Sequence, residues 1–404
     1  MISLQSARIS CMISAVDARA RPGENEEETI MHKLGFGMMR LPLLDPKQTS
    51  RIDVSLVSAM ADAFLAQGFT YSDTAYGYHG GESERAVREA VVRRHDRSAF
   101  TLADKMPLFR FKPTDTAADQ EKLFQEQLEK CGVDFFDNYL LHCVDAANYE
   151  IAKRLDTFAF LSRMKAEGKI RRLGFSFHDT AEVLDRVLTE RPEAEFVQLQ
   201  INYLDWEDER VQSRKCYETA RRHGKPVVVM EPVKGGRLAR LPQAAAELLT
   251  RLHPDWTPAA WALRFAAGLE GVDMVLSGMS DMAQLEENTR IMAAPEPLTA
   301  EELEALARAA EIISAAPVIA CTACGYCADG CPRQIPIPEL FSLYNEDQLS
   351  MRQGRPADRE KYRSLTEGRG RASGCVSCRQ CEQQCPQHLE ITNWLERVKN
   401  TYEG

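Results

Sequence analysis

Eight of the twelve cysteines in this 404-residue chain lie in two runs of identical spacing near the C-terminus. The first run, CTACGYCADGCP, extends from Cys321 to Pro332, and the second, CVSCRQCEQQCP, extends from Cys375 to Pro386. Each run follows the pattern C-x2-C-x2-C-x3-C-P, which is typical of chains that wrap a cubane [4Fe-4S] cluster. The spacing therefore predicts two such clusters.

The ligand sets follow from a rule for two-cluster ferredoxins, in which the fourth cysteine of each run ligates the other cluster. Zinc is the alternative for closely spaced cysteines. Zinc ribbons, however, use two C-x2-C pairs without the C-x3-C-P ending, so the pattern favours iron–sulfur clusters. The predicted ligands are Cys321, Cys324, Cys327 and Cys385 for one cluster, and Cys375, Cys378, Cys381 and Cys331 for the other.

A second group of chemically capable residues stands at the ends of three predicted strands. Asp73 lies near the end of TYSDT and Tyr78 follows five residues later, whereas Lys105 ends FTLADK and His142 ends FDNYLLH. An ammonium beside a phenol stabilises the phenolate and is expected to lower the pKa of the tyrosine. The aspartate could hold the lysine, and the histidine could hydrogen-bond a substrate oxygen. Together these groups would polarise a carbonyl so that it accepts hydride at carbon and a proton at oxygen.

These side chains need a scaffold that gathers strand ends. Between Leu34 and about Ala294, short apolar runs alternate with longer amphipathic ones. Eight strand–helix pairs predict a closed α/β (β/α)8 barrel, where catalytic groups lie at the C-terminal ends of the strands. A doubly wound open sheet is the rival, but LGFGMMRLP lacks its glycine-rich phosphate turn. The expected strands are LGFGM, TYSDT, FTLADK, FDNYLLH, RRLGFS, FVQLQIN, PVVVM and DMVLSG.

The patterns divide the chain into four segments. Residues 1–30 contain the polar stretch RARPGENEEE and are expected to be a disordered or non-native extension, with Met31 as the native start. Residues 31–296 form the predicted barrel. Residues 297–316 form a connecting helix, with Thr299 as N-cap and Glu302 at the capping-box position. Residues 317–404 form a small, mainly helical ferredoxin-like domain.

The barrel segment resembles the aldo-keto reductase family. SDTAYGYHGGESE is similar to the family's Asp-Thr-Ala-x-x-Tyr signature, and the positions of the lysine and histidine fit its tetrad. The added ferredoxin-like segment resembles the iron–sulfur branch of that family. The resemblance implies that Tyr78 is the proton donor and that Asp73, Lys105 and His142 support it. The neighbouring Tyr76 fails the five-residue spacing.

The same resemblance implies a nicotinamide cofactor. LGFSFHD and VQLQIN are similar to segments that grip the carboxamide, VMEPVKGGRL to the pyrophosphate loop, and LSGMSDMAQLEEN to the adenosine-phosphate loop. Gly278 and Gln284 stand where NADPH-specific members carry Lys and Arg, which pair with a 2′-phosphate. NADH and NADPH therefore both stay open. The implied cofactor residues are Ser176, Gln198, Met230, Pro232, Val233, Gly235, Ser277, Gly278, Gln284, Glu287 and Asn288.

Composition limits the partners and the compartment. The formal net charge of -10 argues against a nucleic-acid surface. The sequence contains no run of eighteen apolar residues, so it predicts no membrane-spanning helix. Two oxygen-sensitive clusters, and four scattered cysteines expected to be reduced thiols, indicate a reducing cytoplasm. The scattered cysteines are Cys11, Cys131, Cys143 and Cys216.

The predicted barrel and the predicted ferredoxin-like domain transfer different numbers of electrons. A hydride carries two electrons, whereas each cluster transfers one, and no flavin signature is present to link the two. The clusters could be structural, could serve an external partner such as ferredoxin or flavodoxin, or could feed one-electron chemistry. The sequence favours NAD(P)H-dependent reduction of a small-molecule carbonyl, or the reverse alcohol oxidation. The alternative is a ferredoxin-like electron-transfer protein whose barrel is a docking or one-electron reduction scaffold. The loops 108–113 and 203–210, with Trp206, are expected to shape the substrate pocket.

Overall fold

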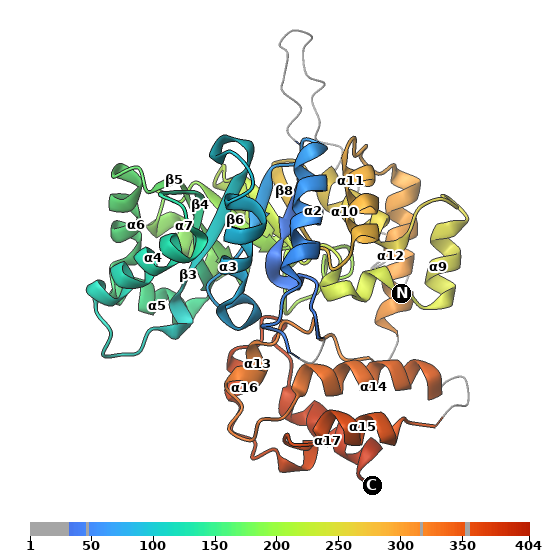
Figure 1. The fold of residues 1–404 in the computed structure, drawn as a ribbon. Helices are drawn as coiled ribbons and strands as arrows, with labels where there is room; N and C mark the ends of the chain where they lie inside the picture. The colour runs from blue at the N-terminus through green and yellow to red at the C-terminus, as the bar shows by residue number, and fades with distance from the viewer. Residues whose placement is uncertain (1–31, 46–47, 316–317, 352–355) are drawn as a thin grey trace. The chain divides into compact units, whose positions relative to one another are not determined.

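The computed structural model describes residues 32–45, 48–315, 318–351 and 356–404 (Figure 1). The expectations for residues 1–30 and for a start at Met31 lie outside these residues. The chain divides into two compact units. Among the described residues, the barrel unit comprises those up to Val233 together with Thr250–Ala307, and the cysteine unit comprises Lys234–Leu249 and those from Arg308 onward. The segment Lys234–Leu249, which the sequence places in the barrel, thus belongs by its contacts to the cysteine unit.

Eight parallel strands close into a barrel in chain order, and β1 completes the ring by pairing with β8. This closure confirms the predicted (β/α)8 barrel and excludes the open sheet, whose edge strands would stay unpaired. Each expected strand is present within a few residues of its predicted bounds. The strands are β1 (Leu34–Gly37), β2 (Tyr71–Asp73), β3 (Thr101–Pro107), β4 (Phe136–Val144), β5 (Ile170–Phe177), β6 (Phe196–Gln200), β7 (Val227–Met230) and β8 (Val272–Gly278).

The helices of the barrel unit surround the strands (Figure 1). Several begin at the polar caps that local chemistry favours, such as Asp53, whose carboxylate accepts from Leu56 N at 3.0 Å. The longer helices are α2 (Val54–Ala66), α4 (Ala117–Cys131), α5 (Ala146–Arg154), α6 (Thr157–Ala166), α7 (Ala181–Glu190), α8 (Ser213–Arg222), α10 (Pro258–Gly268) and α11 (Met282–Met292). The shorter ones are η1 (Met38–Arg40), η2 (Tyr78–Gly81), α3 (Ser83–Val87), η3 (Arg88–Val92), η4 (Arg97–Ala99) and η5 (Leu108–Arg110).

Helix α12 (Ala300–Ser314) contains the boundary between the units. Its N-terminus confirms the predicted capping box, because Thr299 N donates to Glu302 Oε2 at 2.6 Å and Glu302 N donates to Thr299 Oγ1 at 3.3 Å. Two backbone donors that the helix leaves without partners are thereby satisfied.

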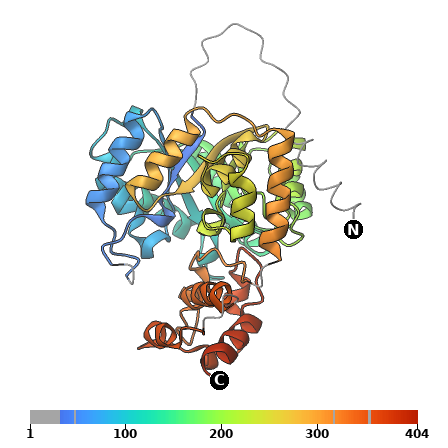
Figure 2. The ribbon, with the colours of Figure 1, turned by 90° about the vertical axis from the view of Figure 1, so that its right-hand side faces the viewer.

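The cysteine unit has its own apolar core, formed mainly by its longer helices (Figure 2). Leu340 and Leu395 are buried in it, and Tyr362 stacks on Tyr402 with ring centroids 4.9 Å apart. Tyr402 also donates to Asp347 Oδ2 at 2.7 Å, which satisfies a buried phenol. The helices are η6 (Lys234–Ala239), α9 (Gln243–Thr250), α13 (Tyr326–Asp329), α14 (Ile337–Met351), α15 (Arg359–Thr366), η7 (Ala372–Gly374), α16 (Gln380–Gln383) and α17 (Ile391–Tyr402).

Among the described residues, no helix combines the length and the apolar composition needed to cross a membrane.

Candidate functional site

The alternation of side chains along a strand explains which residues reach the end of the barrel. An apolar layer fills the barrel interior and includes Tyr71, Ala103 and Leu140. Because side chains alternate with a period of two, the next residues to face inward on these strands are Asp73, Lys105 and His142. These three stand at or near the C-terminal ends of β2, β3 and β4. The sheet therefore assembles three of the four predicted tetrad residues.

The fourth tetrad residue, Tyr78, begins η2 directly after β2. Lys105 Nζ donates to Asp73 Oδ1 at 2.5 Å and to Thr74 O at 2.7 Å, and lies 3.5 Å from Tyr78 Oη. The lysine and the aspartate are each at least 97 % buried, since their side chains are 1 % and 3 % exposed. The structure thus brings the ammonium, the carboxylate and the phenol together in a buried cluster.

The pKa values of this cluster differ in one respect from the sequence-based expectation. Burial raises the pKa of Tyr78 to about 12, and Lys105 lowers it only in part. The expectation of a net lowering is therefore wrong for the unliganded site, because desolvation of the phenolate outweighs the ammonium. Burial acts to lower the pKa of Lys105, but Asp73 and Tyr78 outweigh it, so this pKa is raised. At neutral pH the site holds a phenol beside an ammonium.

His142 stays neutral at physiological pH. Burial lowers its pKa well below the usual range, and the charge of Lys105 lowers it further. Its ring packs edge-on against Tyr78 with centroids 6.1 Å apart, and against Phe109 of η5 at 5.5 Å. Phe109 is 37 % exposed. An apolar side chain from the loop 108–113 therefore packs against the histidine.

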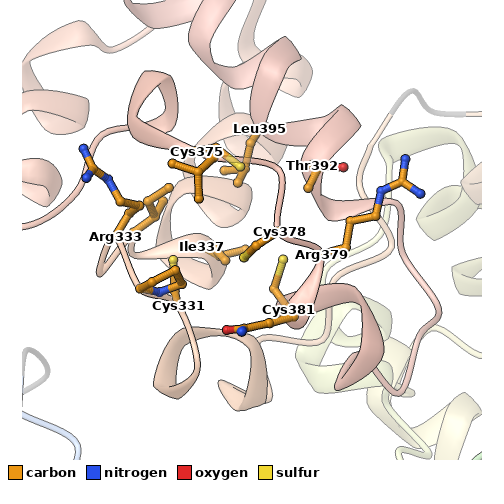
Figure 3. Close-up of a pocket in the computed structure, with 13 residues that line it drawn as sticks. Cys331, Arg333, Ile337, Cys375, Cys378, Arg379, Cys381, Thr392 and Leu395 are labelled. Carbon is orange, nitrogen blue, oxygen red and sulfur yellow. The ribbon is translucent and has the colours of Figure 1, made fainter.

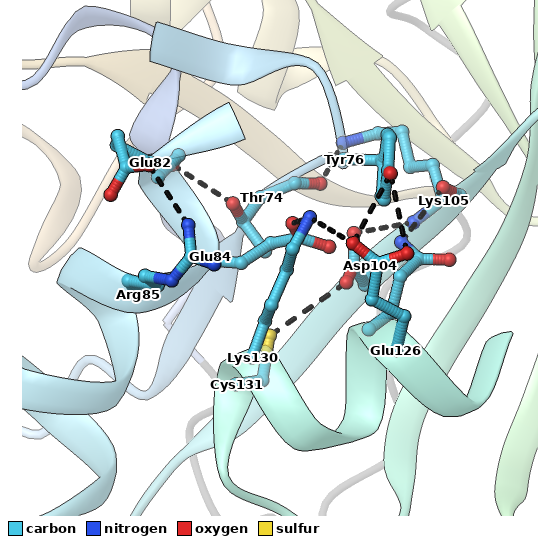
Figure 4. Close-up of polar contacts among 12 residues, drawn as sticks. Thr74, Tyr76, Glu82, Glu84, Arg85, Asp104, Lys105, Glu126, Lys130 and Cys131 are labelled. Carbon is cyan, nitrogen blue, oxygen red and sulfur yellow. Dashed lines mark hydrogen bonds and ion pairs between the residues drawn. The ribbon is translucent and has the colours of Figure 1, made fainter. Parts of the chain in front are cut away.

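Tyr76, which the spacing rule rejects, lies in a different environment (Figure 4). Its hydroxyl donates to Glu126 Oε1 at 3.2 Å, and Lys130 Nζ lies 3.9 Å from its ring centroid. Lys130 and Glu126 both belong to α4, outside the barrel. The geometry thus places the two neighbouring tyrosines in different environments.

Two predicted carboxamide contacts, Ser176 on β5 and Gln198 on β6, lie near Met230 of β7, another implied cofactor residue. Gln198 is buried, its Nε2 lies 3.4 Å from Met230 Sδ, and its Oε1 has no hydrogen-bond partner among the described residues. Ser176 Oγ accepts from Cys143 N at 2.9 Å and keeps its own proton for donation. A buried amide oxygen without a partner is costly, so Gln198 fits a ligand that donates an N–H, such as a nicotinamide carboxamide.

The predicted adenosine loop follows β8. Asn288 Nδ2 donates to Ser277 Oγ at 3.0 Å, whereas Gln284 is exposed in the first turn of α11, where its side-chain oxygen accepts from Ser280 N at 2.9 Å. Glu287 Oε1 is buried without a hydrogen-bond partner among the described residues. A Cβ on Gly278 would lie 3.0 Å from the Cβ of Arg40. Arg40 of η1 therefore lies against this loop. The sequence contains no sign of this contact, because Arg40 and Ser280 of the loop are 240 residues apart in the chain.

The remaining predicted cofactor residues follow β7. Pro232 is buried and Val233 is half-buried, both in the barrel unit. Gly235 lies in the cysteine unit with φ +63°, and a Cβ there would lie 2.7 Å from Thr322 Cα. Close approach of Thr322 is thus sufficient to explain this glycine, which the sequence attributed to an approaching pyrophosphate.

Trp206, which the sequence leads us to expect at the substrate pocket, is a buried residue of the barrel unit. Its side chain is 1 % exposed and packs on Tyr217 and Phe265, with ring centroids 5.7 and 5.4 Å away. An aromatic residue in a loop is ambiguous in sequence, because the same residue type serves binding and packing.

The eight motif cysteines form two groups of four within the cysteine unit. The first cavity is lined by Cys321, Cys324, Cys327 and Cys385, together with residues such as Thr322 and Gln387. The second cavity is lined by Cys331, Cys375, Cys378 and Cys381, and Figure 3 shows these four side chains around one space. Each cavity therefore takes its fourth cysteine from the other run. Four soft thiolate donors around one space fit a [4Fe-4S] cluster.

A buried acidic pair lies behind Lys105, on the outer face of the barrel (Figure 4). Asp104 Oδ1 accepts from the backbone N of Lys105 at 2.8 Å, and its Oδ2 lies 3.7 Å from Cys131 Sγ. Glu84 of α3 is fully buried, and its Oε2 lies 3.3 Å from Lys130 Nζ. Burial raises the pKa of Asp104 well above its usual range, and the Glu84 carboxylate raises it further. Sequence reasoning treated Asp104 only as part of a strand.

Comparison with known families matches both parts of the chain. The Aldo/keto reductase family matches residues 33–311, and the 4Fe-4S dicluster domain matches residues 320–390. An aldo-keto reductase of Mycobacterium sp. (strain KMS) is 31 % identical over 145 residues, which cover 36 % of this chain and 45 % of that relative. An uncharacterized oxidoreductase of Schizosaccharomyces pombe is 24 % identical over 285 residues, which cover 69 % of this chain and 87 % of that protein. The chain thus matches less than half the length of the mycobacterial relative.

Solved structures give the same fold. The holo form of an aldo-keto reductase of Bacillus halodurans is 26 % identical with a TM-score of 0.55, covering 69 % of this chain and 91 % of that one. An aldo/keto reductase of Klebsiella pneumoniae in complex with NADP and acetate is 20 % identical with a TM-score of 0.53, covering 68 % and 90 %. With a closed barrel and a family match over residues 33–311, the chain belongs to the aldo/keto reductase family of oxidoreductases and carries a 4Fe-4S dicluster domain at its C-terminal end.

Proposed function

We propose that this protein catalyses NAD(P)H-dependent reduction of a small-molecule carbonyl, or the reverse oxidation of an alcohol, with Asp73, Tyr78, Lys105 and His142 as its tetrad. One observation carries the proposal. The ammonium of Lys105 is bonded to the Asp73 carboxylate at 2.5 Å and lies 3.5 Å from the hydroxyl of Tyr78. A buried phenol beside a fixed cation is suited to deliver a proton to a developing alkoxide.

The tetrad residues have separate tasks. Tyr78 donates its proton to the carbonyl oxygen, and Lys105 stabilises the phenolate that remains. Asp73 fixes the position of the lysine. His142 is neutral because its pKa lies well below the usual range, so its ring can donate a hydrogen bond to the substrate oxygen without adding a positive charge.

The cofactor residues would place the reacting ring beside this tetrad. A reduced nicotinamide, when bound, supplies hydride to the carbonyl carbon. Gln198 would accept from the carboxamide with its Oε1, and Ser176 would donate to the same amide. Met230, which lies 3.4 Å from Gln198 Nε2, would pack on the ring face. Ser277, Gly278, Gln284, Glu287 and Asn288 would bind the adenosine end.

The two tyrosines provide a matched test of the tetrad. Tyr78→Phe removes the proposed proton donor and keeps the ring, so kcat for reduction of a reactive aromatic aldehyde should fall about 10²- to 10⁴-fold. Tyr76→Phe removes only the hydrogen bond to Glu126, and its kcat should stay within about twofold of the parent protein. Affinity for the nicotinamide nucleotide, measured by fluorescence titration without oxygen, should be unchanged in both variants.

Two results would contradict this assignment. Equal kcat values for Tyr78→Phe and the parent protein would remove Tyr78 from the mechanism. Failure of both NADH and NADPH to bind at millimolar concentration would favour the alternative, in which the barrel is a docking or one-electron reduction scaffold for an electron-transfer protein.

We further propose that the cysteine unit holds two [4Fe-4S] clusters, one at each cavity, with the four cysteines of that cavity as ligands. Such clusters supply one-electron transfer. A ferredoxin or a flavodoxin is the class of partner that matches this chemistry. Protein purified without oxygen should contain about eight iron and eight sulfide per chain if the assignment is correct, and about four of each if one cavity serves another purpose.

A further inference from the structure

A lysine from the chain segment after β7 is buried inside the cysteine unit. Lys234 begins η6, its side chain is almost fully buried, and its Nζ donates to Gln387 Oε1 at 3.0 Å. Both residues belong to the cysteine unit. Long cationic side chains are seldom buried unless they have a partner that needs the charge.

Gln387, the hydrogen-bond acceptor of Lys234, lies at the first cavity. Gln387 is 3 % exposed, follows Cys385 by two residues and lines the first cavity with Thr322. The residue after Lys234 also packs on this region, because a Cβ on Gly235 would lie 2.7 Å from Thr322 Cα. The segment 234–235 thus contacts both chain stretches that supply cysteines to the first cavity.

The charges at the second cavity have a different setting. Arg333 and Arg379 line it, but both are exposed, and the Arg379 side chain is 72 % exposed. Arg379 also faces the Glu382 carboxylate at 3.8 Å. Water and ions screen exposed charges, whereas a buried ammonium acts through a medium of low dielectric constant. The two cavities therefore differ in the electrostatic field that the chain supplies.

We propose that the positive charge of Lys234 raises the reduction potential of the cluster at the first cavity above that of the cluster at the second. The proposal rests on the proposed function in one respect, namely that both cavities hold clusters. Uptake of one electron from an external reductant changes a four-thiolate [4Fe-4S] cluster from charge 2− to 3−, with no bond broken. A nearby ammonium stabilises the more negative state, so the first cavity accepts the first electron.

The test is a potentiometric titration of the full-length protein, prepared without oxygen and followed by electron paramagnetic resonance. In Lys234→Met, one of the two clusters should show a reduced-to-oxidised ratio about tenfold lower than in the parent protein at the same potential, which is about 59 mV for one electron. Lys234→Arg keeps the charge and should titrate like the parent. Lys361→Met removes a lysine whose side chain is 48 % exposed and pairs with Glu346, and should change neither cluster.

The shifted cluster is identified by repeating the titration in a Cys378→Ser background, where the second cavity lacks a ligand. The downward shift caused by Lys234→Met should persist there. Unchanged potentials in Lys234→Met with eight iron bound, or equal shifts of both clusters, would overturn the proposal. Fewer than eight iron in the parent protein would instead contradict the proposed function.

A neutral variant that loses iron is also informative. If Lys234→Met and Lys234→Gln both retain only about four iron while Lys234→Arg retains eight, the charge is needed to retain a cluster rather than to set its potential, and the proposal fails. If all three variants lose both clusters, Lys234 has a purely structural role and the proposal fails.

Discussion

The barrel site and the cysteine cavities are built in opposite ways. Asp73, Lys105 and His142 lie on strands of a closed sheet, and the lysine and aspartate hold each other directly. Most of the motif cysteines lie on loops, where non-glycine residues such as Ala323 and Ser377 have φ of 52° and 55°. A left-handed conformation costs such residues about 1–2 kcal/mol each. The barrel thus preforms its site, whereas the strain in the cysteine loops would be offset by the clusters proposed to bind there.

The largest effect should follow from breaking a cavity. Cys327 is buried in the first cavity, so Cys327→Ala removes a proposed ligand and should halve the iron content of protein prepared without oxygen. Its cysteine unit should also become sensitive to protease while the barrel stays resistant, as seen by mass spectrometry of the fragments. Cys216→Ala, which removes a buried thiol from α8, is the control and should keep its iron. Full iron content in Cys327→Ala would show that the cavities are not ligand sets.

Within the barrel, stability and chemistry should separate. Lys105→Met leaves the Asp73 carboxylate buried without its counterion and should lower the free energy of unfolding by about 3–5 kcal/mol, with kcat falling at least 10³-fold. Adding Asp73→Asn removes the uncompensated charge. The double variant should therefore recover most of the stability in urea titrations but none of the activity. Recovery of both properties would mean that the ion pair only supports the fold.

The dependence of kcat/KM on pH should reflect the protonation states of the buried Tyr78 and His142. Burial raises the pKa of Tyr78 to about 12, and the pKa of His142 lies well below its usual range. Neither group changes protonation between about pH 7 and pH 10, so carbonyl reduction should be nearly constant there and decline as the pH approaches 12, where the proton donor is lost. A bell-shaped profile centred near neutral pH would indicate that another group controls the step.

Local periodicity made most of the barrel predictable. Runs such as FDNYLLH and FVQLQIN predict both a strand and the face on which its last residues lie. Their polar last residues could therefore be placed at the strand ends before any contact was known. What failed required non-local information. Cys143, next to His142, has φ 57° and is held by Ser176 Oγ from β5 at 2.9 Å, an arrangement without a signal in its own segment. The sign of the net pKa change at Tyr78 likewise depends on burial, which spacing does not measure.

The cysteine unit shows the same limit more strongly. The spacing of the two runs predicts four cysteines for each cluster, because the ligands must meet one cubane geometry. It does not predict that Lys234 joins this unit, since the hydrogen bond from Lys234 to Gln387 spans 153 residues. The loop with Gly235 was therefore interpreted as a pyrophosphate loop from its resemblance to the family. Its packing against Thr322 could not be predicted from the sequence.

The smallest effect concerns the outer face of the barrel, where Asp104 is buried beside Glu84. Burial raises the pKa of Asp104 above its unfolded value, so the stability associated with this carboxyl is fully present below the unfolded pKa and is lost as the pH rises through the folded pKa. Asp104→Asn cannot ionise and keeps an oxygen for the backbone N of Lys105. Its free energy of unfolding should therefore fall less than that of the parent protein between pH 5 and pH 9, by about 1–2 kcal/mol.

The exposed pair around Asp62 gives a control of opposite sign. The hydrogen bond from Arg94 lowers the pKa of Asp62, so its stabilising contribution is present above the unfolded pKa and is lost as the pH falls through the folded pKa. Asp62→Asn should therefore flatten the acid limb of urea titrations. If Asp104→Asn behaves in the same way, the acidic pair is ionised in the folded barrel, and Lys130 compensates for both carboxylates. Because Asp104 also holds the backbone of Lys105, that result would extend the preformed electrostatic network of the active end through the barrel wall.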